Sequence, residues 1–287
     1  MAGAPHEEPV GVTLARMRRA KKLTGAVLAK RVGMSQPKIS RIERGRGSAD
    51  PEDILVIARA LGADESLARA LADRAAQAHD RMTDWRPTPE SLAGRQQDVA
   101  DWESAARTVR DFQPALLPGL LQTSEYARAA MRAFLRLEST AADGTADAAL
   151  LAAVTARFRR QEVLADTARS FQFVITEAVL RSRICPPTEM LAQVDHLRKL
   201  SGLPHVRLGI IPEGAPVDLP PMHGFTLLDD TLVVIDVYNT GLTSRGRNDV
   251  ELYRRVFDVF QSSATDEVGP MLDRYRTDYI DQLRAGS

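Results

Sequence analysis

The residues best suited to chemistry in this sequence are polar and cationic side chains that recur at helical spacing from Gln36 to Arg44. Gln36 carries an amide that donates and accepts hydrogen bonds, and Arg41 carries a planar guanidinium with several donors. Lys38 and Arg44 add positive charge within the same two turns. An amide pairs well with adenine, a guanidinium pairs well with guanine, and cations bind phosphates. The pattern therefore predicts a partner that is a polyanion with hydrogen-bonding edges.

Two short helical patterns joined by a tight turn must position these side chains. Leu28 and Val32 lie on one face of the first pattern, and Ile39 and Ile42 lie on one face of the second. Gly33 stands between them, and glycine is the usual residue where a helix ends in a left-handed conformation. This is the geometry of a helix-turn-helix, whose second helix enters the major groove of DNA. The alternative is an ordinary helical hairpin with a basic face.

Capping residues mark where both helices begin. We expect Thr24 to cap the first helix and Ser35 to cap the second, because a hydroxyl oxygen can accept a hydrogen bond from a backbone N–H of the first turn. Pro37 suits a first turn, where its missing N–H has no partner in any case. The second helix is expected to end at Gly45.

The run LAKRVGMSQPKISRIERG resembles the repressor/Cro-like helix-turn-helix of the xenobiotic-response-element family. It carries that family's Leu-Ala, Gly, Ser, Ile-Ser and Glu-x-Gly positions. The residues that the resemblance implies as base readers are Gln36, Pro37 and Arg41. The residues that it implies as phosphate contacts are Thr24, Lys38, Ser40, Arg44 and Arg46. It also implies a structural ion pair between Arg18 and Glu43. The sequence departs from the family at Gly25, where a glutamine often touches phosphate.

The charge of the chain is balanced overall and uneven along its length. The 287 residues include 38 Lys and Arg and 38 Asp and Glu. Eleven basic and two acidic residues lie between Gly11 and Asp50, so that this segment carries +9 and the rest carries −9. A basic module on an acidic body predicts that the module alone binds a polyanion, here double-stranded DNA. The single cysteine, Cys185, excludes an internal disulfide framework and is typical of a reducing cytoplasm. We expect no signal peptide and no membrane span, and hence a cytoplasmic protein.

The chain is expected to have four parts. Residues 1–10 predict a disordered tail, residues 11–80 a helix-turn-helix DNA-binding domain, residues 81–95 a linker with two prolines, and residues 96–287 a regulatory and dimerisation domain. The first helix is expected to begin at Thr13. The fold class that follows is mainly α, with an all-α five-helix repressor-like domain before an α+β domain that has a small sheet.

The second domain is predicted to alternate helices with short strands. The predicted helices are 96–112, 123–138, 147–165, 187–200, 249–261 and 266–284. The predicted strands are 171–175, 205–211, 225–228 and 232–237. Asp229-Asp230 indicates a hairpin between the last two strands, and the order around 171–211 permits a parallel pair. Residues 239–248 are expected to form a polar loop. Leu67 in the first domain and Leu252 in the second are expected to point inward.

A second resemblance covers roughly Gln96 to Leu283. The run PGLLQT-x-x-YAR at 118–128, with later blocks at 157–164 and 171–181, is similar to the C-terminal domain of actinobacterial WhiJ-like, antitoxin-like transcriptional regulators. It implies control by a small acidic protein encoded nearby. Because one recognition helix reads only a few base pairs, a homodimer is also expected. The helices at 96–112 and 266–284 are candidates for its seam, or alternatively for the domain's own core.

No set of residues predicts catalysis or metal binding. The five histidines lack metal-ligand spacing, and the sequence has no nucleophile elbow, phosphate-binding loop or dinucleotide fingerprint. We therefore expect no enzyme activity, no catalytic residue, no metal and no cofactor. Two alternatives remain. One is a repressor that senses a small molecule, with PALLPGLLQ at 114–122 and the loop at 239–248 as pocket walls. The other is an enzyme attached to a DNA-binding domain.

Overall fold

The computed structural model has two compact units. The first comprises Met1–Trp85 and Leu242–Asp249, and the second comprises Arg86–Gly241 and Val250–Ser287. The residues that the structure describes are 8–44, 50–79, 83–85, 92–138, 145–216, 218–238 and 240–285. Within them, no helix combines the length and the apolar character that crossing a membrane requires.

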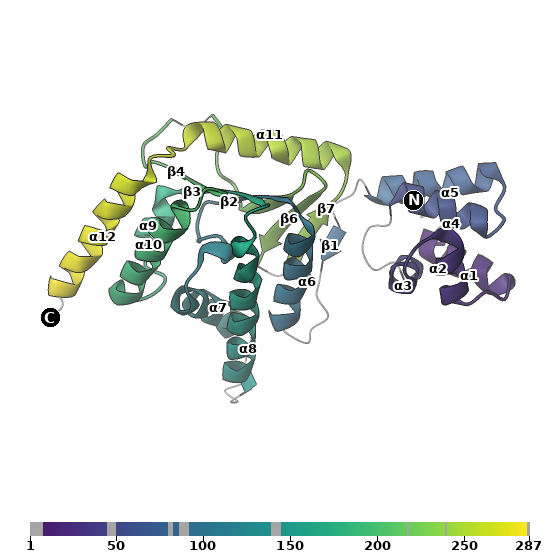
Figure 1. Ribbon diagram of the computed structural model, residues 1–287, viewed down its shortest axis with the longest axis horizontal. Helices are drawn as coiled ribbons and strands as arrows, with labels where there is room; N and C mark the ends of the chain where they lie inside the picture. The colour runs from purple at the N-terminus through teal and green to yellow at the C-terminus, as the bar shows by residue number, and fades with distance from the viewer. Residues whose placement is uncertain are drawn as a thin grey trace, which may run out of the picture. The chain divides into compact units, whose positions relative to one another are not determined.

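The first unit contains five helices, as the sequence predicts. They are α1 (Val10–Ala20), α2 (Gly25–Val32), α3 (Gln36–Glu43), α4 (Pro51–Ala60) and α5 (Glu65–His79), shown in Figure 1. Their core is aliphatic: Leu14, Leu28 and Ile54 have no exposed surface, and Ile39 and Ile57 are 1% exposed. Burying such side chains is worth about 1.5–3 kcal/mol each, which holds these short helices together.

Local chemistry fixes the turn between α2 and α3. Thr24 Oγ1 accepts a hydrogen bond from the Val27 backbone N–H at 3.2 Å, and Ser35 Oγ accepts one from the Lys38 N–H at 3.3 Å. Gly33 has φ of 69°, the left-handed conformation that a residue without a Cβ adopts at little cost. These caps are the ones that the sequence predicts.

Four predictions in the first unit are wrong in detail. Helix α1 begins at Val10, so Thr13 lies inside it, buried, and donates its hydroxyl to Glu8 Oε2 at 2.9 Å. The predicted tail 1–10 is thus structured at residues 8–10, while residues 1–7 lie outside the described residues. Helix α3 ends at Glu43, and Gly45 also lies outside the described residues. Leu67 is 42% exposed, because Ala68 and Leu71 occupy the inward positions of α5.

A mixed sheet forms the centre of the second unit. Three strands run parallel: β2 (Thr108–Gln113), β3 (Ser170–Thr176) and β4 (Val206–Ile211). Strand β5 (Phe225–Leu228) pairs antiparallel with β2, and β6 (Leu232–Val237) pairs antiparallel with β5. The order is β6-β5-β2-β3-β4. The parallel pair and the hairpin confirm the sequence predictions.

Asp229 and Asp230 make the tight turn of that hairpin. Both have positive φ, 53° and 56°, which aspartate tolerates better than most residues, and the Thr231 backbone N–H closes the turn by donating to the Leu228 carbonyl oxygen at 3.0 Å. The Asp229 carboxylate also accepts hydrogen bonds from the backbone N–H groups of Arg107 at 2.8 Å and Thr108 at 2.7 Å. The turn is therefore tied to the start of β2.

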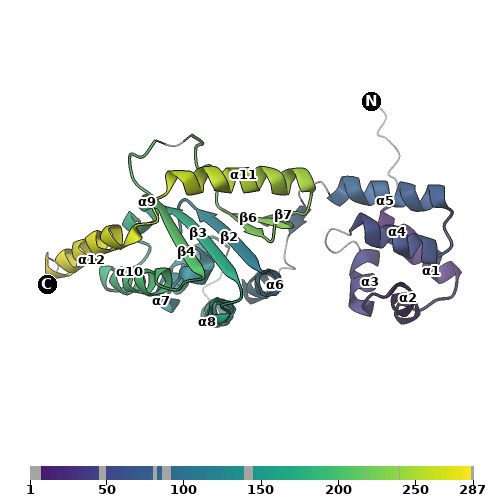
Figure 2. The same cartoon turned by 45° about the horizontal axis from the view of Figure 1, so that its top comes forward.

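Helices cover both faces of this sheet. The larger set is α6 (Leu92–Ala105), α7 (Ser124–Glu138), α8 (Thr145–Arg160), α9 (Glu177–Arg181), α10 (Pro187–Ser201) and α12 (Val268–Ala285). Helix α11 (Arg247–Ser263) lies on the opposite face from α6, α7, α8 and α10 (Figures 1 and 2). Its Phe260 stacks on Phe112 of β2, with ring centroids 3.9 Å apart. The fold class is the predicted one, mainly α with an α+β second unit.

Three segments differ from the sequence predictions. The predicted helix 96–112 ends at Ala105, and residues 108–113 are the central strand β2. The predicted loop 239–248 holds the strand β7 (Thr240–Ser244) and the first residues of α11. The predicted linker 81–95 contains the strand β1 (Thr83–Trp85) and the start of α6.

The apolar spacing around β2 explains the first of these errors. Trp102, Ala106 and Val109 recur three or four apart, which fits a continuing helix. Strands β3 and β5 pair with residues 108–113 from either side, and those long-range hydrogen bonds override the local period. The prediction that Leu252 points inward is also wrong. Leu252 is 48% exposed, because Val250 and Phe257 form the inward face of α11.

Candidate nucleic-acid interface

Helix α3 separates a buried apolar side from an exposed polar side. Ile39 is 1% exposed and Ile42 is 8% exposed, and both pack into the core of the first unit. Gln36, Pro37 and Arg41 are exposed on the other side. The two isoleucines thus fix the helix, so that the three predicted base readers share one accessible surface. Rigid positioning of this kind is what reading base edges requires.

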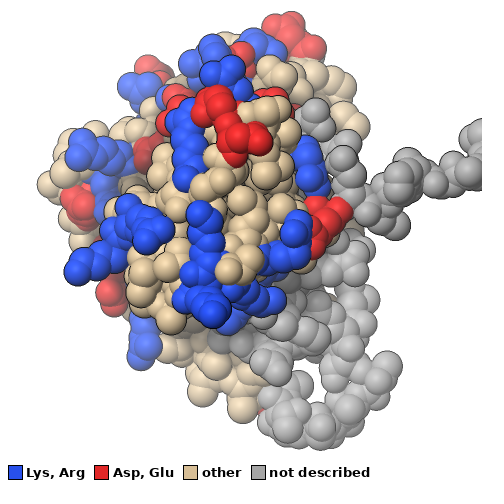
Figure 3. Space-filling view, turned by 90° about the vertical axis from the view of Figure 1, so that its right-hand side faces the viewer, with Lys and Arg blue, Asp and Glu red and all other residues tan. Residues whose placement is uncertain are grey.

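Positive charge on this surface is available for a polyanion. Arg41 and Arg44 are both exposed, and within the described part of the chain neither forms an ion pair. Lys and Arg side chains also gather in the middle of the face that Figure 3 shows, which is the right-hand side of the view in Figure 1. Arg46, the remaining predicted phosphate contact of this helix and its following loop, lies outside the described residues.

An ion pair joins α1 to the end of α3. Arg18 Nε donates to Glu43 Oε1 at 2.6 Å, and Arg18 Nη2 donates to Glu43 Oε2 at 2.7 Å. Arg18 Nη1 also donates to the Leu23 carbonyl oxygen at 2.7 Å. The side chains are only 15% and 12% exposed, and the hydrogen bonds to Glu43 raise the pKa of Arg18. The negative charge of Glu43 is therefore paired with Arg18 within the fold. A phosphate near α3 would not meet an unpaired carboxylate.

Helices α1 and α3 also approach closely at Gly11. A Cβ at that position would collide with the carbonyl oxygen of Ile42 and touch that of Glu43. Glycine removes this obstacle, so the ion pair between Arg18 and Glu43 can close with good geometry. The close packing of α1 against α3 thus depends on a glycine at position 11.

Lys38 has an intramolecular partner that the sequence does not reveal. Its Nζ lies 2.7 Å from Asp53 Oδ2 of α4, with side chains 43% and 17% exposed. The ammonium therefore fastens α3 to α4 and faces a carboxylate before any phosphate arrives. Partly exposed pairs of this kind contribute little stability, about 0–1 kcal/mol, so a phosphate can compete for the lysine.

Removing the Asp53 charge is expected to strengthen DNA binding. In Asp53→Asn, Lys38 is free to bind phosphate, and the surface carries one negative charge fewer. The affinity of the protein for duplex DNA should therefore rise about 3- to 10-fold at low salt. Fluorescence anisotropy across a salt series measures the affinity. The slope of log affinity against log salt concentration should steepen by the equivalent of about one phosphate contact. Asp64→Asn, another carboxylate of the first unit, is the matched control. An affinity equal to that of the wild type would mean that Lys38 only positions α3.

The start of α2 adds a second anion-binding feature. Thr24 is exposed and its oxygen caps the helix, so its hydroxyl hydrogen remains able to donate. Gln36 extends over this helix start, because a Cβ built on Gly25 would lie 3.7 Å from Gln36 Nε2. Backbone N–H groups at a helix N-terminus favour phosphate. Ser40 is half-buried on α3, which leaves it a weaker candidate for phosphate contact.

The second unit holds a layer of buried polar side chains between α6, α8 and the sheet. Glu103 is 2% exposed, and its Oε2 lies 2.9 Å from Arg160 Nε, although neither atom has a hydrogen bond of good geometry among the described residues. Arg160 Nη1 and Arg157 Nε both donate to Gln96 Oε1, at 3.0 and 3.1 Å. Sequence patterning gave no signal for this layer, because its members are far apart in the chain.

Burial shifts the pKa values of this layer toward the neutral forms. Desolvation raises the pKa of Glu103 to about 7, against the attraction of Arg160. It raises the pKa of Asp111 on β2 to about 7 as well, although Gln113 Nε2 donates to that carboxylate at 2.9 Å. Burial also lowers the pKa of Arg157 to about 9. The interior of the unit thus disfavours the charged forms of these three groups.

The first predicted pocket wall proves to be part of the hydrophobic core. In the run 114–122, Leu117, Leu120 and Leu121 are 1–2% exposed and belong to the main core cluster. Gln193 Nε2 donates to the Leu121 carbonyl oxygen at 2.8 Å, and Gln161 Nε2 donates to the Gln122 carbonyl oxygen at 2.7 Å. The motif therefore forms a buried crossing between helices, and these three leucines belong to the core.

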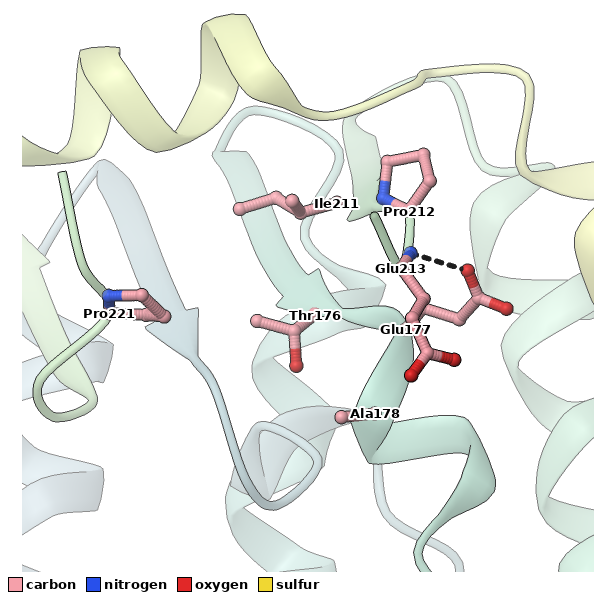
Figure 4. Close-up of a pocket in the computed structure, with 7 residues that line it drawn as sticks. All are labelled: Thr176, Glu177, Ala178, Ile211, Pro212, Glu213 and Pro221. Atoms are coloured by element: carbon pink, nitrogen blue, oxygen red, sulfur yellow. Dashed lines mark hydrogen bonds between the residues drawn. The ribbon is translucent and has the colours of Figure 1, made fainter. Parts of the chain in front are cut away.

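A small pocket lies elsewhere, at the carboxyl ends of β3 and β4. Its volume is about 160 Å³, and its lining is almost entirely apolar, with Ile211, Pro212 and Pro221 around the opening shown in Figure 4. The Glu177 carboxylate beside it is 7% exposed and already accepts hydrogen bonds from the Glu213 backbone N–H at 2.7 Å and Tyr275 Oη at 2.9 Å. Within the described residues, no group of His, Cys, Asp and Glu has a metal-binding arrangement.

Two known families match separate parts of the chain. Residues 9–71 match a family described as a helix-turn-helix domain, and residues 96–268 match one described as a domain of unknown function, DUF5753. No curated protein matches the chain significantly.

The chain has a distant likeness to a solved structure. It is similar to the structure of TrmBL2, an archaeal chromatin protein with a novel mode of DNA binding, at 13% identity over 89% of this chain and 93% of that one. The TM-score is 0.32, which carries no argument about function. The match to the DUF5753 family, over residues 96–268, spans more than half of the sequence. The chain is therefore a member of the DUF5753 family that carries an N-terminal helix-turn-helix domain.

Proposed function

We propose that this protein is a sequence-specific transcriptional regulator whose first unit binds operator DNA. The observation that carries the proposal is the arrangement of α3, where two buried isoleucines hold the helix and Gln36 and Arg41 face outward. Arg41 is proposed to read guanine and Gln36 to read adenine. Pro37 offers only apolar contact, which suits a thymine methyl group.

The remaining surface of the first unit is proposed to hold the DNA backbone. The phosphate contacts in this proposal are Arg44, Arg46, Thr24 and Ser40, with Lys38 joining them once it leaves Asp53. Such contacts orient the protein without reading sequence. Their charge makes binding strongly dependent on salt, since each neutralised phosphate releases counterions.

The protein is proposed to act as a homodimer on an inverted repeat. One recognition helix covers only a few base pairs, so two copies bound to half-sites about 34–36 Å apart would supply enough sequence for a specific operator. Residues 96–287 would join the copies and receive the regulatory signal. The proposal includes no catalytic activity and places the protein with the DNA in the cytoplasm.

The signal is proposed to be a small acidic protein encoded nearby, as in an antitoxin-like pair. The resemblance of the run PGLLQT-x-x-YAR supports this partner. The alternative is a small-molecule signal, and the pocket beside Glu177 has a volume of about 160 Å³, where ligand pockets typically have about 300–1,000 Å³. Co-expression of the full chain with the neighbouring small protein should yield a complex on purification. Recovery of the two proteins separately would remove this part of the proposal.

Selection from a random duplex pool tests the DNA-binding proposal. The full chain is incubated with the pool, bound duplexes are amplified, and enriched sequences are read after several rounds. We expect an inverted repeat with half-sites one helical turn apart, bound at least about 10³-fold more tightly than random duplex. A pool that stays random at low salt would overturn the proposal.

A further inference from the structure

The outward face of α8 is unusually apolar for an exposed surface. Leu151 and Phe158 are each 60% exposed, and between and beside them the same face carries Ala148, Ala152 and Thr155, all exposed. Spacings of three and four residues align these five side chains in one stripe. Single exposed apolar residues are ordinary, but a stripe of them marks an interaction surface.

The rest of α8 is fully engaged within the second unit. Leu150, Ala153 and Val154 pack with Met131 of α7. Helix α6 packs on the other side, so that α8 lies between α6 and α7 in both views (Figures 1 and 2). The described residues of the second unit therefore leave the stripe uncovered.

The charges at the two ends of the stripe are opposite. Asp147 lies in the first turn and Arg159 lies near the last residue, and both are exposed. Within the residues described, neither one forms an ion pair. Two copies of α8 that pack antiparallel would bring the acidic end of each near the basic end of the other. Parallel packing would bring like charges together, which is unfavourable.

Side-chain size favours the same antiparallel arrangement. When two α8 helices cross antiparallel with the twofold axis beside Ala152, at the level of residue 153 along the helix, Phe158 of one lies level with Ala148 of the other. Leu151 then lies level with Thr155. Each large side chain thus meets a small one, which is the condition for close helix packing. A surface that is complementary to itself in both charge and size is what a twofold dimer requires.

We propose that α8 is the homodimer interface, with two copies packed antiparallel about a twofold axis through its middle. The inference rests on the proposed homodimer and names its surface. One helix pair buries less than the roughly 1,200–2,000 Å² of a stable interface, so the free dimer is weak. An operator with two half-sites strengthens it by raising the effective concentration of one copy near the other.

Sedimentation equilibrium of the full chain without DNA tests this interface. Leu151→Glu places a charge in the stripe and should raise the dimer dissociation constant at least ~10-fold. Leu252→Glu is the matched control, because Leu252 is an apolar residue that is 48% exposed on another helix, α11. This variant should have the dimer dissociation constant of the wild type. A wild type that stays monomeric at hundreds of micromolar, or equal effects of the two variants, would overturn the proposal.

Charge reversal tests the antiparallel register. Asp147→Arg and Arg159→Asp should each weaken the dimer several-fold, and the double variant should restore it, because both pairs are then formed with reversed sign. A double variant weaker than either single one contradicts the arrangement. Binding of Leu151→Glu to a duplex with one half-site separates the two proposals. It should equal that of the wild type, and its loss would instead point to a fault in the DNA-binding unit.

Discussion

Replacing Arg160 with alanine should lower the free energy of unfolding of the second unit by about 3–5 kcal/mol, the usual cost of leaving a buried charge without its partner. Glu103 is 2% exposed and its Oε2 lies 2.9 Å from Arg160 Nε, so at high pH, where Glu103 is charged, the variant leaves this carboxylate unpaired in the interior. Denaturant unfolding followed by circular dichroism measures the loss. Arg255→Ala, an exposed arginine of α11, is the control and should change stability by less than about 0.5 kcal/mol.

The pH dependence of this loss has a definite sign. Burial raises the pKa of Glu103 from 4.5 to about 7 in the folded protein, so its contribution is most favourable below pH 4.5 and is lost as pH rises through about 7. Without Arg160 the charged form is still less favourable, and Arg160→Ala should therefore be more damaging at pH 8 than at pH 5. Replacing both partners, as Glu103→Leu with Arg160→Met, should recover most of the stability. A double variant no better than Arg160→Ala would show that the pair does not carry the effect.

Arg41→Ala is expected to lower operator affinity by about 1–3 kcal/mol, about 5- to 150-fold, and to relax preference at one base position. The reason is that a guanidinium makes two hydrogen bonds to guanine that water cannot replace with equal geometry. Anisotropy titrations on the selected operator and on its single-base variants measure both effects. The stability of the first unit should not change, because Arg41 is exposed and lies outside the core.

Arg44→Ala provides the comparison for Arg41→Ala. If Arg44 binds phosphate, its loss should lower the affinity by the same factor on every DNA sequence. It should also reduce the slope of log affinity against log salt concentration by about one. The two variants thus distinguish base reading from backbone contact on the same helix. A uniform loss for Arg41→Ala would move that residue to the phosphate contacts and leave Gln36 as the main base reader.

The sequence by itself determined the helix-turn-helix, because its signals are local. Thr24, Gly33 and Ser35 form their capping interactions within one helical turn of their own positions. The spacing of Ile39 and Ile42 indicates which side of α3 is buried. The turn at Asp229-Asp230 was readable for the same reason, since two residues with positive φ suffice to make it.

Only the tertiary structure decided the features that depend on partners distant in sequence. Residues 108–113 became a strand because β3 and β5 pair with them, although their apolar spacing suits a helix equally well. Lys38 faces Asp53, and Glu103 faces Arg160, through contacts that no local period encodes. Hydrogen bonds and charges act through space, and the energy of a pairing depends on which segments the fold brings together and how far it removes them from water.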